Sequence, residues 1–364
     1  MSDNSAGEAF CHQTTMLPVR VLIVDDSVVA RKLLREALSA SPGITVAGSA
    51  ADGLIALAKI PQLNPDVITL DVDMPRLNGI QTLVEIRAQY PGLPVIMCSA
   101  LTGRGEAMAH KALSLGASAY VAKPSNSMNP ANAIVNIRDE LSTKITSLIR
   151  RRAHSPVSPH DFISRTSRLT QRVEVLAMGA STGGPNALAF IIPKLPRDLP
   201  VPVLIVQHIP PLFTPLLVNR LNSCSALSVQ EAVDGRILEP GQVWLAPGDR
   251  HLTVARAGND IVLRLSQDPP VNSCRPAVDV LFHSVAQVYG PGALGVVMTG
   301  MGSDGVRGAA RIREGGGGVI VQDESTSVVW GMAGGAVSAG VVDQVCTLPE
   351  IGPAIMRRVW ARGV

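Results

Sequence analysis

The chain has 364 residues, of which 46% are hydrophobic and 17% charged, so it can form two domains that each bury a core. Its formal net charge of +3 is too small and too scattered to favour nucleic-acid binding, and the one basic cluster, Arg150–Arg152, is interpreted as a solvated linker. The five cysteines lack C-x-x-C spacing, which argues against a zinc site or a disulfide framework and for a reducing compartment.

The first residues carry no targeting signal. Residues 1–17 are polar and lack an apolar core segment, so we expect a disordered extension rather than a signal peptide. No run of about 18 uninterrupted apolar residues occurs, so we predict no transmembrane helix and no membrane insertion. Together these features predict a cytoplasmic protein.

Residues 18–140 alternate apolar strands with amphipathic helices. Repeated units of this kind predict a five-stranded parallel, flavodoxin-like sheet of order 2-1-3-4-5 with right-handed crossovers. Residues 141–172 are assigned to a linker, because 151–172 is polar, lacks periodicity and contains two prolines. The expected strands cover 19–24, 44–50, 66–71, 93–100 and 119–123, and the expected helices cover 28–40, 52–60, 80–90, 105–116 and about 130–150.

Polar side chains stand at the ends of these strands. Asp25 and Asp26 follow the first strand, and Asp71 ends the third. Since the carboxyl ends of parallel strands share one edge, these carboxylates should crowd together and need a hard cation such as Mg²⁺. Ser99 and Lys123 end the fourth and fifth strands, where they could contact a group placed on Asp71. Singly, each aspartate is more simply a solvated loop residue, but the ordered set favours a functional site.

The motifs VDDS, DVDMPRLNG, CSA and AYVAKP follow one another along this half. With them the chain resembles the receiver domain of bacterial two-component response regulators. The resemblance implies that Asp71 accepts a phosphoryl group from a histidine kinase. It also implies that Mg²⁺ is held by Asp25, Asp26, Asp71 and the main-chain carbonyl of Asp73.

The same resemblance implies a set of residues that respond to phosphorylation. Ser99 and Lys123 would contact the phosphoryl group, and Tyr120 would be the rotating switch aromatic. Phosphorylation adds charge and acceptor oxygens at one strand edge, which can bias a two-state surface of the domain.

Residues 173–364 again alternate strands and helices. They predict a doubly wound, mostly parallel α/β domain with one β-hairpin that turns at Gly258 and Asn259. The run 315–318 is expected to be a turn, because it lacks the lysine and the spacing of a phosphate-binding loop. The expected strands cover 173–178, 201–206, 242–247, 252–257, 260–265, 293–299, 318–322 and about 341–345, and the expected helices cover 185–194, 213–222, 277–288, 304–314 and 331–339.

Residues suited to nucleophilic catalysis follow apolar runs in this half. Ser181 lies in MGASTGG, a G-x-S-x-G pattern that presents a serine on a tight turn between a strand and a helix. His208 ends VPVLIVQH, and Asp304 lies in MTGMGSDG. Each alone has a simpler explanation: a glycine turn, a satisfied polar residue, or the N-cap of the helix expected after residue 304. Together they favour a hydrolase with a serine nucleophile. The order Ser, His, Asp differs from the Ser, Asp, His of α/β-hydrolases.

A series of motifs runs along the same half. They are GASTGG (179–184), QHIP (207–210), LAPGDRHL (245–252), RPAVDVLFHS (275–284), MTGMGSDG (298–305) and QDESTSVVWGM (322–332). In this set and order the chain resembles the chemotaxis response regulator protein-glutamate methylesterases. The resemblance implies an enzyme that demethylates glutamate methyl esters, releasing methanol, and deamidates specific glutamines on methyl-accepting chemoreceptors. It implies a chemotaxis histidine kinase as phosphodonor and no cofactor for hydrolysis.

The resemblance also assigns the active site and its control. Ser181, His208 and Asp304 would be the catalytic triad, and the main-chain N–H of Met301 would bind the oxyanion. Thr182 and Arg275 would line the site. The unphosphorylated receiver would pack over the site, and phosphorylation of Asp71 would expose Ser181.

The chain departs from the family pattern at residues 333–335, where Ala-Gly-Gly replaces the usual continuation with proline, and at residues 211–212. We expect both departures in loops, where they would bear on docking. Other classes remain as alternatives: a catalytically silent scaffold, a general small-ester hydrolase, and a nucleic-acid-binding output domain. The last predicts a compact basic helical domain, whereas this half is α/β and near neutral.

Overall fold

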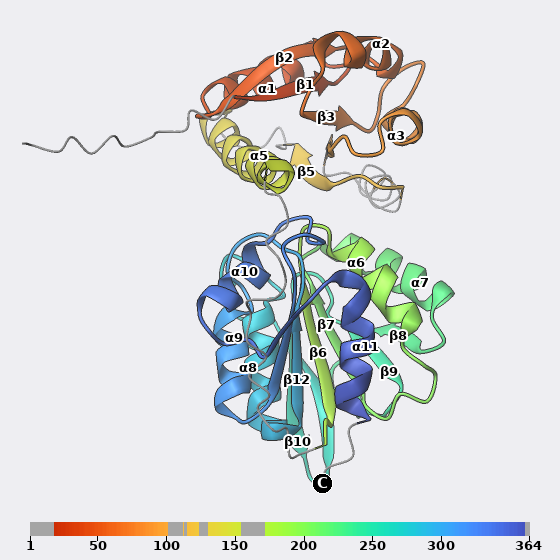
Figure 1. Cartoon of the computed structure of the whole chain (residues 1–364), viewed down its shortest axis with the longest axis vertical. Coiled ribbons are helices and arrows are strands. Elements are labelled where there is room, and N and C mark those ends of the chain that lie inside the picture. The colour runs from red at the N-terminus through yellow and green to blue at the C-terminus, as the bar shows by residue number, and fades with distance from the viewer. Residues whose placement is uncertain (1–17, 101–111, 113–114, 124–129, 154–171, 361–364) are drawn as a thin grey trace, which may run out of the picture.

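The computed structural model describes residues 18–100, 112, 115–123, 130–153 and 172–360. The described residues form two α/β domains that follow each other along the long axis of the molecule (Figure 1). The extension expected over 1–17, most of the helix expected over 105–116 and residues 154–171 of the expected linker lie outside the described residues. None of the described helices is long and apolar enough to cross a membrane.

The first domain is a five-stranded parallel sheet of order β2-β1-β3-β4-β5, which confirms the predicted fold and strand order. Helices α1 and α5 cover one face, and α2 and α3 cover the other. The strands are β1 (Val19–Val24), β2 (Ile44–Ala50), β3 (Val67–Asp71), β4 (Val95–Ala100) and β5 (Ala119–Lys123), and the helices are α1 (Val28–Ser39), α2 (Gly53–Leu63), α3 (Gly79–Gln89) and α5 (Pro130–Ala153).

Local signals explain these bounds. Every residue of β3 is buried, as expected for a parallel strand covered on both faces. The Asn78 side chain accepts from Gln81 N and the Gln81 side chain accepts from Asn78 N, a reciprocal capping box that starts α3. Helix α5 continues to Ala153, so its second half lies within the range 141–172 that the sequence analysis assigned to the linker.

The second domain is a seven-stranded sheet of order β14-β13-β12-β6-β7-β9-β8, in which all neighbours are parallel. A separate antiparallel hairpin, β10–β11, has the expected turn. The strands are β6 (Val175–Ala180), β7 (Val203–Gln207), β8 (Ser228–Glu231), β9 (Gln242–Leu245), β10 (His251–Ala257), β11 (Asp260–Ser266), β12 (Ala293–Val297), β13 (Gly318–Gln322) and β14 (Gln344–Cys346).

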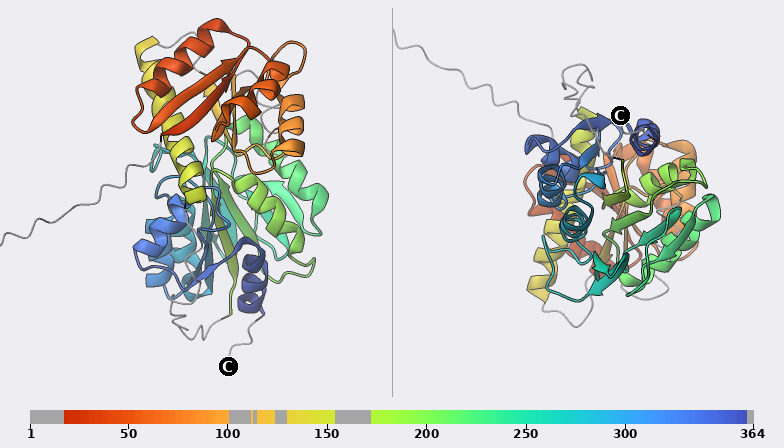
Figure 2. Two further views of the ribbon diagram at one scale, coloured as in Figure 1. Left: turned by 45° about the horizontal axis from the view of Figure 1, so that its top comes forward. Right: turned by 90° about the horizontal axis from the view of Figure 1, so that it is seen from below.

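Helices cover both faces of this sheet (Figures 1 and 2). Helices α6, α7 and α11 pack on one face, and α8, α9, α10 and the hairpin pack on the other. The helices are α6 (Gly184–Ile191), α7 (Thr214–Cys224), α8 (Val278–Tyr289), α9 (Val306–Glu314), α10 (Gly331–Ser338) and α11 (Leu348–Val359), and short 3-10 turns lie at η2 (Ile192–Lys194), η3 (Pro211–Phe213) and η4 (Gly290–Gly292).

Two elements of the second domain were not predicted. Strand β8 is short and partly polar, and it is recruited to the sheet edge by pairing with β9. Helix α11 contains Gly352 and Pro353, which obscure its period, but a capping box between Thr347 and Glu350 starts it and its apolar face is buried. Tertiary packing therefore overrides weak local signals at both places.

One expectation about the family departures is wrong. Residues 333–335 lie within α10 and not in a loop. A Cβ at Gly334 would come within 2.9 Å of the Trp330 ring, so the small residue allows the helix to pack against this aromatic. Residues 211–212 belong to the turn η3, directly before Phe213.

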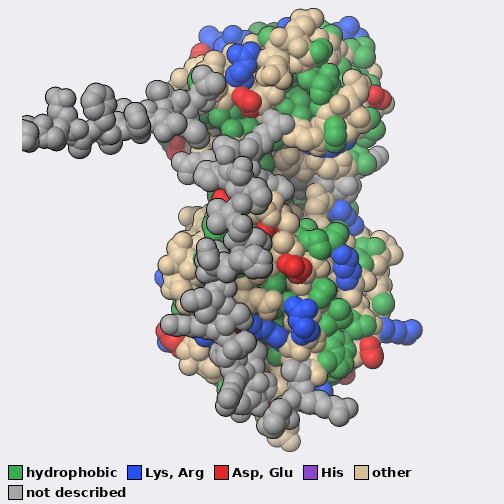
Figure 3. Space-filling view, viewed as in Figure 1, with side chains coloured by type: hydrophobic (Ala, Val, Ile, Leu, Met, Phe, Trp, Pro, Cys, Tyr) green, Lys and Arg blue, Asp and Glu red, His purple; other side chains and the backbone are tan. Residues whose placement is uncertain are grey.

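The surface carries charges of both signs. On the face shown in Figure 3, lysine and arginine side chains are interspersed with acidic ones over the described parts of both domains. This mixture agrees with the small net charge of +3 and gives no extended field for a polyanion.

Buried ion pairs of Asp343, the residue before β14, join this strand to the neighbouring elements. Asp343 is 8% exposed, accepts from Val319 N at 2.7 Å, and ion-pairs with Arg313 and Arg358. Asp343→Asn keeps the shape but leaves the arginines without their counter-charge, so we expect the domain to lose about 3 kcal/mol of stability. Thermal unfolding of the full chain would measure the loss. Asp260→Asn, at an exposed hairpin position, is the matched control, and equal melting of both variants would contradict the prediction.

Candidate functional site

Ser181 stands on a turn at the carboxyl end of β6. Its N–H donates to Thr299 O at 3.0 Å, and its carbonyl accepts from Gly184 N at 2.8 Å, so the backbone is held from both sides. Gly183 has a φ of 82°, and a Cβ there would come 2.5 Å from Val328. The turn therefore requires glycine at this position. The Ser181 side chain remains partly accessible.

The loop after β12 passes closely over this serine. A Cβ at Gly300 would lie 2.8 Å from Ser181 Cβ, so only glycine allows this approach. Gly300 N donates to Val329 O at 2.8 Å, whereas within the described chain no hydrogen bond is found for the Met301 N–H. Met301 thus offers a donor beside the serine. Thr182 takes part through its carbonyl, which accepts from Thr299 Oγ1 at 2.8 Å.

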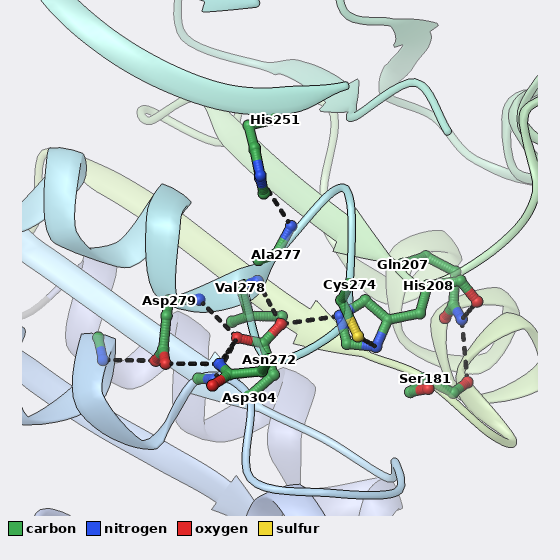
Figure 4. A network of polar contacts seen from close by, with 12 residues as sticks. Ser181, Gln207, His208, His251, Asn272, Cys274, Ala277, Val278, Asp279 and Asp304 are labelled. Carbon is green, nitrogen blue, oxygen red and sulfur yellow. Dashed lines mark hydrogen bonds and ion pairs between the residues drawn. The ribbon is translucent and has the colours of Figure 1, made fainter. Parts of the chain in front are cut away.

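His208 follows β7 and faces Asp304. The Nε2 atom of His208 lies 2.8 Å from Asp304 Oδ2, and the two side chains are only 14% and 2% exposed (Figure 4). Gln207 Nε2 donates to the carbonyls of Ser181 at 2.9 Å and His208 at 3.2 Å, so one buried amide ties both turns together. No hydrogen bond between the Ser181 hydroxyl and His208 is found among the described residues.

Asp304 is fixed by the beginning of helix α8. Its carboxylate accepts from Val278 N at 2.6 Å and from Asp279 N at 3.0 Å, so it caps α8. The alternative that it is the N-cap of the following helix is wrong, because Gly305 occupies that position. Burial alone would raise the pKa of Asp304, but the hydrogen bonds from His208 and from the α8 backbone lower it. Asp304 is therefore a carboxylate at neutral pH.

The other nitrogen of the histidine meets a residue that sequence reasoning missed. His208 Nδ1 lies 3.5 Å from Cys274 Sγ, and Figure 4 shows the sulfur next to the imidazole ring. Cys274 lies directly before the motif RPAVDVLFHS (275–284) and outside it, and the spacing of the cysteines gave no signal for Cys274. Cys274 and His208 are 66 positions apart in the sequence, and only the tertiary fold brings them into contact.

The charge state of His208 follows from these neighbours. Burial by itself would lower the pKa of His208, but the bond to Asp304 and the contact with Cys274 raise it to about 9. The ring is thus mostly an imidazolium at neutral pH, and its neutral form increases toward alkaline pH.

The cluster of His208, Cys274 and Asp304 has ligand atoms within 4.8 Å of one another, as a metal site would require. However, both Asp304 oxygens are already taken by main-chain N–H groups and by Asn272 Nδ2. A cation would have to displace these donors, so the donor set does not fit a resident metal.

Arg275 directly follows Cys274 and is held by its own hydrogen bonds. Its guanidinium donates to Asp249 Oδ1 at 2.9 and 2.6 Å and to the carbonyls of Gln267 and Asp268. None of these bonds reaches the serine, the histidine or Asp304. Arg275 instead anchors the loop that carries Cys274.

The expected acidic cluster of the first domain is assembled at one sheet edge. Lys123 Nζ lies 2.7 Å from Asp25 Oδ2 and 2.8 Å from Asp71 Oδ2. Carboxylate oxygens of Asp25, Asp26 and Asp71 lie within 4.8 Å of one another, which suits a hard, oxygen-ligated cation. Asp73 is exposed two positions beyond the end of β3. Burial raises the pKa of Asp71 to about 6, although Lys123 opposes the shift.

A path of contacts leads from this cluster to the second domain. Ser99 is buried, and its carbonyl accepts from the Tyr120 hydroxyl at 3.4 Å. The Tyr120 ring lies 5.8 Å from the Phe213 ring, measured between centroids, at an angle of 57°. Val328, which lies on Gly183, also packs against the apolar cluster formed by α1 and α5. The first domain thus contacts the segments that surround Ser181.

Comparisons with known proteins match both halves. A family model described as CheB methylesterase matches residues 176–355, and one described as response regulator receiver domain matches residues 21–134. A protein-glutamate methylesterase/protein-glutamine glutaminase from Trichodesmium erythraeum (strain IMS101) is 47% identical over 348 residues, which cover 93% of this chain and 99% of that protein.

Further relatives agree with this match. A protein of the same description from Nocardioides sp. (strain ATCC BAA-499 / JS614) is 45% identical over 350 residues, covering 94% of this chain and 95% of that protein. The crystal structure of the Thermotoga maritima CheB methylesterase catalytic domain matches with a TM-score of 0.50 and 39% identity, and covers 51% of this chain and 99% of that one.

The coupling between His208 and Asp304 can be tested by titration. NMR of the histidine ring protons should give His208 a pKa of about 9. Asp304→Asn removes the charge that favours the imidazolium and keeps the burial that disfavours it, so the pKa should fall by about 1–3 units. Asp260→Asn, at its exposed hairpin position, should leave the titration unchanged. A His208 that titrates below neutrality in the unaltered protein would contradict the assignment.

Proposed function

The chain belongs to the protein-glutamate methylesterase/protein-glutamine glutaminase family and carries a response regulator receiver domain, and from this premise we propose that Ser181, His208 and Asp304 are its catalytic triad and that phosphorylation of Asp71 activates it. Its substrates in this proposal are methyl-accepting chemoreceptors. A chemotaxis histidine kinase supplies the phosphoryl group.

The observation that carries the catalytic proposal is the pair formed by His208 and Asp304 next to the Ser181 turn. Asp304 binds His208 through Nε2, so Nδ1 is the nitrogen left to take the serine proton. Ser181 attacks the side-chain carbonyl of a glutamyl methyl ester as neutral His208 accepts its proton, and Asp304 stabilises the imidazolium that results. His208 then returns the proton to the departing methanol, and water hydrolyses the acyl-serine.

The oxyanion formed in each step needs donors that are already in position. Met301 N–H and the backbone at the start of α6 supply them, because the glycines at 183 and 300 bring both segments against Ser181. Such a donor contributes about 3–4 kcal/mol of transition-state stabilisation. The same tetrahedral chemistry handles a glutamine amide, which accounts for deamidation.

The receiver half supplies the control. The carboxylates of Asp25, Asp26 and Asp71 and the carbonyl of Asp73 would hold Mg²⁺, which when bound neutralises charge on the incoming phosphoryl group. The Asp71 carboxylate is the acceptor, and Lys123 lies beside it at 2.8 Å, ready to pair with the added phosphoryl group.

Contact between the domains supports inhibition by the unphosphorylated receiver. Tyr120 touches Phe213, which lies between the His208 segment and α7, and Val328 lies between the receiver and Gly183. The Ser99 carbonyl accepts a hydrogen bond from the Tyr120 hydroxyl, so a phosphoryl group that binds Ser99 disturbs this bond. Movement of Tyr120 then loosens the packing over Ser181 and admits the receptor.

The nucleophile is tested by Ser181→Ala. Methanol release from methylated receptor membranes, measured with a small-molecule phosphodonor and Mg²⁺, should fall by at least about 10⁴-fold, because no hydroxyl remains to form the acyl-enzyme. Ser223→Ala, which alters an exposed serine bonded within α7, is the matched control and should retain the rate. Substantial release by the Ser181 variant would overturn the triad and favour another mechanism.

The gate is tested at the aromatic contact. Phe213→Leu keeps apolar bulk but removes the ring that meets Tyr120, so basal methanol release without phosphodonor should rise several-fold and stimulation by phosphodonor should shrink. Asp71→Asn should keep the low basal rate and show no stimulation. Unchanged basal release in the Phe213 variant, with full stimulation retained, would remove this contact from the switch and leave the hydrolase proposal intact.

A further inference from the structure

Cys274 lies beside the ring nitrogen of His208 that acts as the base in the proposed mechanism. Its sulfur lies 3.5 Å from His208 Nδ1, and the opposite nitrogen is engaged by Asp304 at 2.8 Å. In the proposed mechanism Nδ1 of the neutral ring takes the Ser181 proton, so the thiol lies beside the nitrogen that serves as the base. Whatever changes the chemistry of this sulfur changes the availability of the base.

The loop holds this thiol in a defined place at some conformational cost. Asn272 and Ser273 have φ values of 51° and 60°, in the left-handed region that residues other than glycine enter rarely. Val271 and Cys274 exchange backbone hydrogen bonds of 3.1 and 2.9 Å. The Asn272 amide also donates to Asp304 Oδ1 at 2.8 Å. The loop and the histidine are thus anchored to the same carboxylate.

The other described cysteines lack such a partner. Cys98 and Cys346 are buried, and burial raises the pKa of their thiols to about 12 and about 11. Cys224 is exposed, and its thiol lies 3.2 Å from Arg220 O and 3.5 Å from Leu221 O, with no imidazole among these partners. Of the described cysteines, only Cys274 is both partly accessible and in contact with an imidazole.

We propose that Cys274 is a reversible oxidation site through which a hydroperoxide switches the hydrolase off. This inference rests on the proposed role of His208. In the reaction Nδ1 of neutral His208 takes the thiol proton and the Cys274 sulfur attacks one peroxide oxygen, so that an S–O bond forms and the O–O bond breaks. His208 then gives this proton to the departing oxygen, which leaves as water when the oxidant is hydrogen peroxide. Sulfur loses two electrons and the peroxide gains them.

The product explains the loss of activity. The sulfenic acid places a hydroxyl group next to Nδ1, where it donates a hydrogen bond to the neutral ring and competes with the Ser181 hydroxyl. The added oxygen also fills space between the loop and the histidine. A dithiol reverses the change: one thiol forms a mixed disulfide with Cys274 and releases water, and the second thiol displaces Cys274 as a free thiol.

A chemical readout tests the site without relying on turnover. The full-length protein is treated with hydrogen peroxide in the presence of dimedone, which traps sulfenic acids, and labelled peptides are quantified by mass spectrometry. We expect Cys274 to be labelled at least about tenfold faster than Cys224, and His208→Gln to slow the labelling by a similar factor. Equal labelling of the two cysteines, or labelling indifferent to the histidine, would overturn the proposal.

A second readout connects the label to the enzyme. Methanol release should fall in step with Cys274 oxidation and return after treatment with dithiothreitol. Cys274→Ser, whatever its own rate, should show no loss with peroxide, whereas Cys224→Ser should lose activity as the unaltered protein does. Loss that persists in the Cys274 variant and resists dithiothreitol would assign the damage to Met301 or Met332 instead. Because dimedone reports the sulfur alone, failure of the triad proposal would leave the labelling result standing.

Discussion

The bond between His208 and Asp304 at the beginning of α8 is the constraint on which the chemistry of the second domain depends. It joins His208, which follows β7, to Asp304, which lies beyond β12. The sheet order β12-β6-β7 makes this possible, because the Ser181 strand runs between the other two. Capping by Asp304 also fixes the start of α8, so the same carboxylate organises a helix, a histidine and, through Asn272, the Cys274 loop.

Buried charge is handled in the same way in both domains. Lys123 lies between Asp25 and Asp71, and Asp304 lies among hydrogen-bond donors, so none of these three buried carboxylates is left without a partner. The arrangements differ in consequence. The Asp71 cluster has excess negative charge that a cation can neutralise, whereas the lone pairs of Asp304 are already taken by His208, by Asn272 and by main-chain N–H groups. In the proposed function the first site therefore receives a cation and a phosphoryl group, and the second orients a base.

Packing between apolar side chains joins the two sites. Only 3% of the chain is aromatic, yet the rings of Tyr120 and Phe213 meet between the domains. Val328 adds a second contact directly over Gly183. Because Val328 occupies the place where a side chain at position 183 would stand, packing by the receiver domain reaches the turn that holds Ser181.

Hydrophobic periodicity determined most of the strands and helices of both sheets and the approximate ends of these strands, since buried parallel strands are continuous apolar runs. Polar residues at those ends then indicated Asp71, Lys123, Ser181 and His208. The edge strand β8 and the proline-interrupted helix α11 could not be found this way, because their stability comes from neighbours distant in sequence. For the same reason only the tertiary structure decided that Asp304 caps α8, that Arg275 anchors a loop, and that Cys274 meets His208: each depends on contacts between segments whose separation along the chain carries no local signal.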